Sequence, residues 1–173
     1  MNIPQDIDQL IAGMGAKLAE LLKERQLSRP VMIGIHSGGV WVAQRLHKFL
    51  KLEEPLGTLD ISFYRDDFTR IGMNPQVKPS DLPLSVDDRH IVLVDDVLFT
   101  GRTIRAALNE IFDYGRPATV TLVVLVDRGG RELPVQADIA GIRVELPPGQ
   151  HIKLSGPERL ELSVTKAPDK KSN

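Results

Sequence analysis

Hydrophobic and polar positions divide the first third of the chain into helical and strand-like segments. In residues 4–25 the apolar positions recur every three or four residues, which predicts an amphipathic helix. Residues 31–35 form a short apolar run typical of a buried strand, and residues 40–50 again have helical spacing. Residues 59–64 alternate between apolar and polar positions, the pattern of a half-buried strand.

Residues 65–90 break this rhythm. The stretch contains Gly72, Pro75, Pro79 and Pro83 among many polar residues. A structureless segment of this length is uncommon inside a compact domain, and where it occurs it usually serves function or contains its own hairpin. We therefore predict a mobile lid or a hairpin arm in this part of the chain.

Regular patterns return after residue 90 and indicate the fold class. Residues 91–94 and 119–126 are apolar runs typical of buried strands, and residues 103–114 between them have helical spacing. Shorter strand-like pieces occur at 142–145 and 160–164. Strands that alternate with helices predict an α/β fold with a parallel sheet. We expect one domain over residues 1–165 and a disordered tail over residues 166–173.

Composition narrows the class of protein. The 173 residues are 42% hydrophobic and 26% charged, which argues against wholesale disorder. With 22 basic and 23 acidic side chains, the formal net charge is −1, which excludes binding to nucleic acid by bulk charge. The absence of cysteine excludes disulfides and thiolate metal sites. The N-terminus does not resemble a secretory signal and no apolar run suits a membrane span, so we expect a cytoplasmic protein.

Two adjacent carboxylates carry the clearest chemical signal. Asp95 and Asp96 follow the apolar run 91–94 and precede a short turn, residues 99–103, that leads into a helix. Ligands of open α/β sheets bind at the carboxyl ends of the strands, and backbone N–H groups at a helix N-terminus favour an anion. This arrangement predicts a ligand with sugar hydroxyls and a phosphate. The alternative is a solvated strand end, whereas the glycine patterns of dinucleotide and P-loop sites are missing.

Residues 94–103 resemble the phosphoribosyl pyrophosphate (PRPP) signature of type I phosphoribosyltransferases. Residues 60–67, 115–117, 124–129 and 131–134 extend the resemblance to the PyrR family, pyrimidine operon regulators that are also uracil phosphoribosyltransferases. The resemblance implies a central parallel sheet flanked by helices, a flexible loop and a small hood. It also implies a homo-oligomer, either a dimer or a tetramer, and the reaction of uracil with PRPP to give UMP and pyrophosphate.

The resemblance also assigns roles to individual residues. The catalytic set would comprise the start of the flexible loop and the two signature acids, which also hold the ribose: Arg65, Asp66, Asp67, Asp95 and Asp96. PRPP would be bound by these acids, by the pyrophosphate loop and by the rest of the signature: Ser37, Gly38, Gly39, Val97, Leu98, Phe99, Thr100, Gly101, Arg102 and Thr103. Val126, Asp127 and Arg128 would border the base, and Mg²⁺ would bind mainly through the pyrophosphate of PRPP. Asp127 and Arg128 have an alternative interpretation as a simple salt bridge at a strand end.

Two departures from the family pattern bear on function. The pyrophosphate loop of the family often reads Lys-Thr-Arg-Gly, whereas residues 36–39 here are His-Ser-Gly-Gly, so an arginine is missing where a polyanion would bind. His36 either supplies partial charge near neutral pH or is an ordinary loop histidine. The arginines of the first helix and a histidine, here Gly130, are also missing, which weakens the expectation of a leader RNA partner. The alternatives are an RNA-binding attenuation regulator, responsive to UMP or UTP, with weak catalysis, or a transferase for another base.

Overall fold

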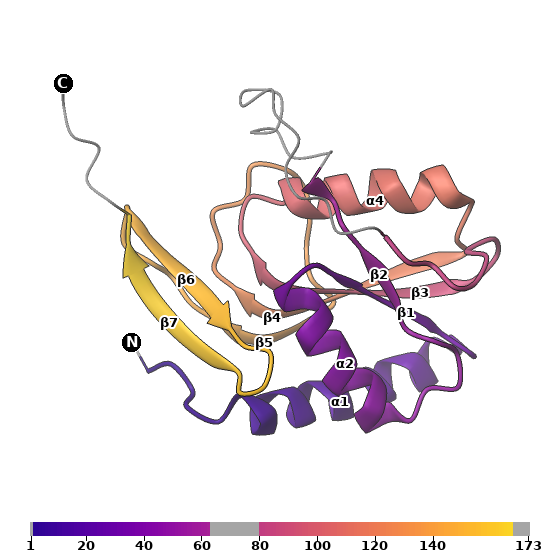
Figure 1. The fold of residues 1–173 in the computed structure, drawn as a ribbon, viewed down its shortest axis with the longest axis horizontal. Coiled ribbons are helices and arrows are strands. Elements are labelled where there is room, and N and C mark those ends of the chain that lie inside the picture. The colour runs from indigo at the N-terminus through magenta and orange to yellow at the C-terminus, as the bar shows by residue number, and fades with distance from the viewer. Residues whose placement is uncertain (1, 63–79, 168–173) are drawn as a thin grey trace.

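Five parallel strands form the centre of the computed structural model, which describes residues 2–62 and 80–167 (Figure 1). Their order across the sheet is β2-β1-β3-β4-β5, and every neighbouring pair is parallel. The strands are β1 (Val31–Ile35), β2 (Gly57–Leu59), β3 (His90–Leu98), β4 (Thr119–Asp127) and β5 (Ile139–Arg143). β1 is buried along its whole length and β3 from Ile91 to Asp95, as expected of a sheet covered on both faces.

Helices cover the two faces of this sheet. Helices α1 (Ile7–Glu24) and α2 (Gly38–Leu50) lie on one face, and α4 (Arg102–Tyr114) lies on the other (Figure 1). α1 begins where the side chain of Asp6 accepts a hydrogen bond from the backbone N–H of Gln9 at 2.9 Å, a typical N-cap. The α/β class predicted from the alternating patterns is therefore confirmed.

The hydrophobic core consists of two clusters, one on each face of the sheet. On the α1–α2 face, Leu18 of α1 and Leu46 of α2 are fully buried against strand residues such as Val94. On the α4 face, Ile111 of the helix packs with Ile33 and other strand residues. Because β3 contributes side chains to both clusters, its central position is fixed from both sides, and so is the segment that follows its apolar run.

A separate antiparallel hairpin joins β6 (Gln150–Ser155) and β7 (Glu161–Lys166). It stands at one side of the molecule, beside the N-terminal segment (Figure 1). Ile152 and Leu154 of β6 pack into the core cluster on the α1–α2 face. The hairpin corresponds to the small hood that the family resemblance implies. Lys166, where the predicted tail begins, is the last residue of β7, and residues 168–173 lie outside the described residues.

The predicted strand over residues 59–64 is wrong in its bounds, because the strand is β2 and ends at Leu59. The chain turns at the next residue: the carboxylate of Asp60 accepts hydrogen bonds from the backbone N–H of Ser62 at 3.0 Å and from its hydroxyl at 2.5 Å. Residues 63–79, which include most of the predicted lid or hairpin arm, lie outside the described residues. Where the description resumes, Asp81 forms an antiparallel bridge with Thr58.

Among the described residues, no helix is both long and apolar enough to cross a membrane.

Candidate active site

Asp95 and Asp96 lie just past the point where the pairing of β3 with β1 ends. The last pair between these strands is Gly34 with Val94, whereas the pairing of β3 with β4 runs on to Leu98 and Asp127. The expected end of the strand at Val94 is therefore wrong by four residues, because a strand keeps its backbone pairing through polar side chains when a neighbour is in register. The two acids therefore belong to the part of β3 that extends beyond its pairing with β1.

The backbone orients both carboxylates. Asp95 is only 4% exposed, and its Oδ1 accepts a hydrogen bond from the N–H of Asp96 at 2.9 Å. Oδ1 of Asp96 in turn accepts one from the N–H of Val97 at 2.8 Å. An ionised carboxylate has about four acceptor positions. One backbone bond therefore fixes the direction of the Asp96 carboxylate and leaves it acceptor capacity for ligand hydroxyls.

The predicted pyrophosphate loop touches this acid pair. Ser37 is the N-cap of α2, and Gly38 and Gly39 are its first residues, so this helix begins two residues before the predicted start. A Cβ atom placed on Gly38 would lie 2.8 Å from Cγ of Asp96, and one on Gly39 would lie 2.6 Å from the carbonyl oxygen of Val94. The two glycines therefore allow the N-terminus of α2 to approach β3 at the acids.

The turn after β3 supplies a second helix N-terminus at the same edge of the sheet. Gly101 is the N-cap of α4 and has a φ of 94°, a conformation that favours glycine. Oγ1 of Thr100 accepts a hydrogen bond from the N–H of Arg102 at 3.2 Å, and Thr103 lies in the first turn of α4. The positive end of the helix dipole and the first N–H groups favour an anion here.

The predicted base-binding segment, at the end of β4, contains a charged cluster. Asp127 is 7% exposed and forms ion pairs with Arg131 at 2.8 Å and Arg143 at 3.7 Å. Burial alone would raise the pKa of Asp127, but hydrogen bonds from Arg131 and the Gly129 N–H, together with both arginine charges, lower it. Among the described residues, Asp127 pairs with these two arginines and not with Arg128, so the ion pair differs from the Asp127–Arg128 salt bridge of the alternative interpretation.

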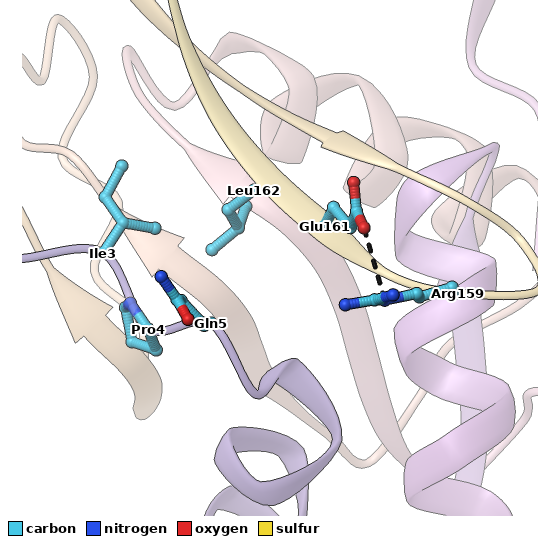
Figure 2. Close-up of a pocket in the computed structure, with 6 residues that line it drawn as sticks. All are labelled: Ile3, Pro4, Gln5, Arg159, Glu161 and Leu162. Atoms are coloured by element: carbon cyan, nitrogen blue, oxygen red, sulfur yellow. Dashed lines mark ion pairs between the residues drawn. The ribbon is translucent and has the colours of Figure 1, made fainter.

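A cavity of about 340 Å³ opens beside this cluster. Its lining comprises Asp127, Gly129, Arg143, Val144 and Glu145. Val126 is fully buried in the core, and its side chain is not part of this lining. A second hollow of about 380 Å³ lies between the N-terminal segment and β7, where Arg159 and Glu161 form an ion pair at 3.2 Å (Figure 2). Its lining contains none of the predicted site residues.

Phe99 and Arg128 connect the turn after β3 to the charged cluster at the end of β4. Cζ of Arg128 lies 3.9 Å from the centroid of the half-exposed Phe99 ring, within cation–π distance. Arg128 also donates to the carbonyl oxygen of Gln150 at 3.1 Å, and burial lowers its pKa. A Cβ atom on Gly130 would lie 2.9 Å from Cδ2 of Phe99, so the glycine at the position of the missing histidine makes room for this ring.

Some predicted residues serve the fold more than the surface of the site. Leu98 is fully buried on the α4 face, and Val97 packs against the opposite core cluster. Arg65, Asp66 and Asp67 lie outside the described residues, so their predicted roles stay predictions. In residues 2–62 and 80–167, no group of three or more His, Cys, Asp or Glu side chains is placed to hold a metal ion.

Sequence reasoning missed a cluster of acids beside the sheet. The Ser80 hydroxyl bonds to a carboxylate oxygen of Glu110, on α4, and accepts a hydrogen bond from the N–H of Asp60 at 3.0 Å. Burial, with the nearby charges of Asp60 and Asp113, raises the pKa of Glu110 although the bond from Ser80 opposes this. Asp60, Ser80 and Glu110 are distant from one another in the sequence, and no motif joins them, so no local signal reveals the cluster.

Comparison with known proteins identifies the family. The family model of the phosphoribosyl transferase domain matches residues 5–153. A protein of Nitrosococcus oceani named Bifunctional protein PyrR is 59% identical over 170 residues, covering 95% of this chain and 96% of that protein. The chain belongs to the PyrR family of phosphoribosyltransferases. The PyrR protein of Pseudomonas paraeruginosa is 56% identical, over 94% of this chain and 95% of its own.

Solved structures agree with this PyrR-family fold. The hypoxanthine phosphoribosyltransferase of Trypanosoma cruzi is 24% identical with a TM-score of 0.63, over 81% of this chain and 74% of its own. A glutamine mutant of an HPRT, made to analyse an invariant aspartic acid, is 26% identical with a TM-score of 0.64, over 80% of this chain and 77% of its own. The expected type I phosphoribosyltransferase fold is therefore confirmed.

Proposed function

We propose that the chain transfers the phosphoribosyl group of PRPP to uracil, giving UMP and pyrophosphate. One observation carries the proposal: the contact of Gly38 with Asp96 brings the N-terminus of α2 and the acid pair to one edge of the sheet. The turn that starts α4 follows the same strand directly. A ligand with a pyrophosphate, sugar hydroxyls and a phosphate fits these neighbouring groups in that order.

In this proposal each group binds one part of PRPP. Asp95 and Asp96 accept hydrogen bonds from the two ribose hydroxyls, because carboxylates are strong acceptors and these two are oriented by the backbone. Residues 100–103 hold the 5′-phosphate at the N-terminus of α4. Residues 37–39 hold the pyrophosphate at the N-terminus of α2, through backbone N–H groups instead of the arginine that often stands in the family loop.

The chemistry asks the protein mainly for position and electrostatics. A bond forms between a ring nitrogen of uracil and C1 of the ribose, while the bond from C1 to the pyrophosphate oxygen breaks and the uracil proton is released. Positive charge develops on the sugar ring as pyrophosphate departs, and fixed carboxylates next to the ring favour that charge. Holding both reactants in contact supplies most of the remaining acceleration.

Mg²⁺ fits the chemistry of these residues. The edge of the sheet offers the oxygen ligands of Asp95 and Asp96 and no cysteine, and Mg²⁺ prefers one or two carboxylates together with substrate phosphates. When bound, the ion would neutralise charge on the pyrophosphate. Because no three side chains of the described residues group into a metal site, the proposal places most of its ligands on PRPP and water.

A base panel tests the identity of the acceptor. Uracil, hypoxanthine, guanine and orotate are each incubated with PRPP and Mg²⁺, and nucleotide formation is followed by chromatography. We expect uracil to be converted with a kcat/KM at least about tenfold above that of any other base, because a site that hydrogen-bonds one base leaves polar groups unpaired with another. Preferential conversion of a purine would replace uracil in the proposal and keep the transferase activity.

We propose a second activity, regulation of pyrimidine genes through a leader RNA, because the relatives at 59% and 56% identity are named bifunctional. Binding of a pyrimidine-operon leader is measured with and without UMP or UTP at several salt concentrations. We expect the nucleotide to strengthen binding, and the logarithm of affinity to fall with the logarithm of salt concentration because phosphate contacts release counterions. An absence of binding, or a slope near zero, would remove this second activity and leave the transferase unaffected.

A further inference from the structure

The guanidinium group of Arg131 bonds to three separate parts of the chain. Nη2 donates to Oδ1 of Asp127 at 2.8 Å, Nη1 donates to the carbonyl oxygen of Phe99 at 2.7 Å, and Nε donates to the carbonyl oxygen of Val135 at 2.7 Å. The Arg131 side chain is 23% exposed and the Asp127 side chain 9%, so the bonds to Asp127 and Val135 are partly shielded from water, whereas the bond to Phe99 is exposed. Such charge-assisted bonds are among the stronger ones in proteins.

These three acceptors belong to the two halves of the proposed site. Phe99 opens the turn that leads into α4, where the 5′-phosphate is proposed to bind. Val135 packs on Gly101 of the same turn, because a Cβ atom placed on Gly101 would lie 3.2 Å from the Cβ atom of Val135. Asp127 ends β4 and lines the cavity on the base side. Arg131 therefore connects the phosphate-binding turn directly to the carboxylate that borders the base side.

The contact pattern requires an arginine. A planar guanidinium offers five donors in a fixed fork, which lets one side chain hold acceptors in different directions. The ammonium group of a lysine is a compact charge at the end of a flexible stem, so it can pair with Asp127 but cannot keep the same three bonds. The backbone N–H groups of Glu132 and Leu133 bond to the carbonyl oxygen of Thr100 at 2.9 and 3.0 Å, which keeps the same loop close to the turn.

We propose that Arg131 is a positioning residue that sets the spacing between the phosphate-binding turn and the base side of the site. The inference rests on the proposed function, because it assigns the two half-sites to a phosphate and a base. Its consequence is specific to ligands that occupy both halves at once. UMP spans the two half-sites, whereas ribose 5-phosphate occupies only the phosphate half and the ribose contacts.

The test compares these two ligands. Dissociation constants of UMP and ribose 5-phosphate are measured by calorimetry for the wild type, Arg131→Met, Arg131→Lys and the control Arg25→Met. Arg131→Met removes every donor and keeps an apolar stem, whereas Arg131→Lys keeps a charge for Asp127 and guards against a folding defect. Arg25 pairs with Asp138 at 3.1 Å just before β5, at the opposite end of the sheet from the acids, so its loss removes an ion pair without touching the site.

We expect Arg131→Met to weaken UMP binding by about 30-fold or more and ribose 5-phosphate binding by less than about threefold, because a buried charge pair is broken and the two half-sites lose their spacing. Arg131→Lys should lower the ratio of UMP affinity to ribose 5-phosphate affinity by about tenfold, and Arg25→Met should leave this ratio unchanged. A general loss of stability would weaken the binding of both ligands by the same factor, and this result would overturn the inference.

The outcomes separate the two proposals. A wild type that binds UMP no better than ribose 5-phosphate has no base half-site, which overturns the proposed function and the inference with it. A wild-type preference for UMP that survives in both Arg131 variants overturns the inference and leaves the proposed function standing.

Discussion

Gly38 lies against the carboxyl group of Asp96, and a Cβ atom on this glycine would lie 2.8 Å from Cγ of the acid. The contact joins the N-terminus of α2 to the extended part of β3, two segments that lie far apart in the sequence. Only the hydrogen atom of a glycine fits at position 38, because real Cβ atoms do not approach other atoms so closely. The proposed pyrophosphate and ribose contacts therefore depend on a glycine at this position.

Replacing Gly38 with alanine tests this dependence. We expect Gly38→Ala to displace the α2 N-terminus or the Asp96 side chain and to lower kcat/KM for PRPP by about 100-fold, because a displacement of about 1 Å costs that much in a positioned site. Gly13→Ala is the matched control, because a Cβ atom there meets nothing within 4 Å and the position is inside α1. This control should keep its activity and gain about 0.5–1 kcal/mol in stability. Full activity of Gly38→Ala would contradict the assignment.

Glu110 gives the free energy of unfolding a distinctive pH dependence. Because burial raises the pKa of this carboxyl in the folded protein, the folded state loses stability as pH rises from the unfolded pKa, about 4.3, through the folded one. Glu110→Gln removes the charge and can still bond to Ser80. Urea unfolding should show the variant more stable than the wild type at pH 7.5, with the gap narrowing toward pH 4. A gap that stays constant with pH would contradict the raised pKa.

Asp127 is expected to behave in the opposite sense. Because its pKa is lowered in the folded state, the ionised carboxylate of Asp127 stabilises the fold at pH values above the unfolded pKa of about 3.9. This stabilisation is lost as pH falls through the folded pKa. Asp127→Asn should cost about 2 kcal/mol at pH 7, because hydrogen bonds to a charged group are broken. The difference from the wild type should be equal at pH 7 and pH 5 and shrink only below about pH 4. A difference that stays constant down to pH 3 would contradict the lowered pKa.

The sequence predicts the helices and the central strands well where apolar residues repeat without interruption. It misplaces the end of β3, because Asp95 and Asp96 stop the apolar run while the backbone continues to pair with β4. It places a strand over residues 59–64, although the side chain of Asp60 turns the chain there. The strand β6 escapes notice because only Ile152 and Leu154 face the core and the rest is polar or exposed.

The site is predictable in its parts and not in its assembly. The acid pair and the turn up to Thr103 form a continuous motif, so local sequence is enough to find them. The approach of Gly38 to Asp96 depends on the strand order, and the bonds of Arg131 depend on the path of the chain after β4. Such contacts follow from the packing of distant segments, which hydrophobic spacing does not encode.

Labelled uracil incubated with PRPP and Mg²⁺ tests whether the chain is a uracil phosphoribosyltransferase. The wild type should form UMP and pyrophosphate in equal amounts, and the double variant Asp95→Asn, Asp96→Asn should form UMP at least about 100-fold more slowly, because the charges that favour the developing positive sugar are gone. Asp8→Asn, which removes an exposed carboxylate paired with Arg45 at 3.0 Å, is the control and should match the wild type. A wild type that forms no UMP would overturn the transferase activity, and a double variant as active as the wild type would overturn the role of the two acids.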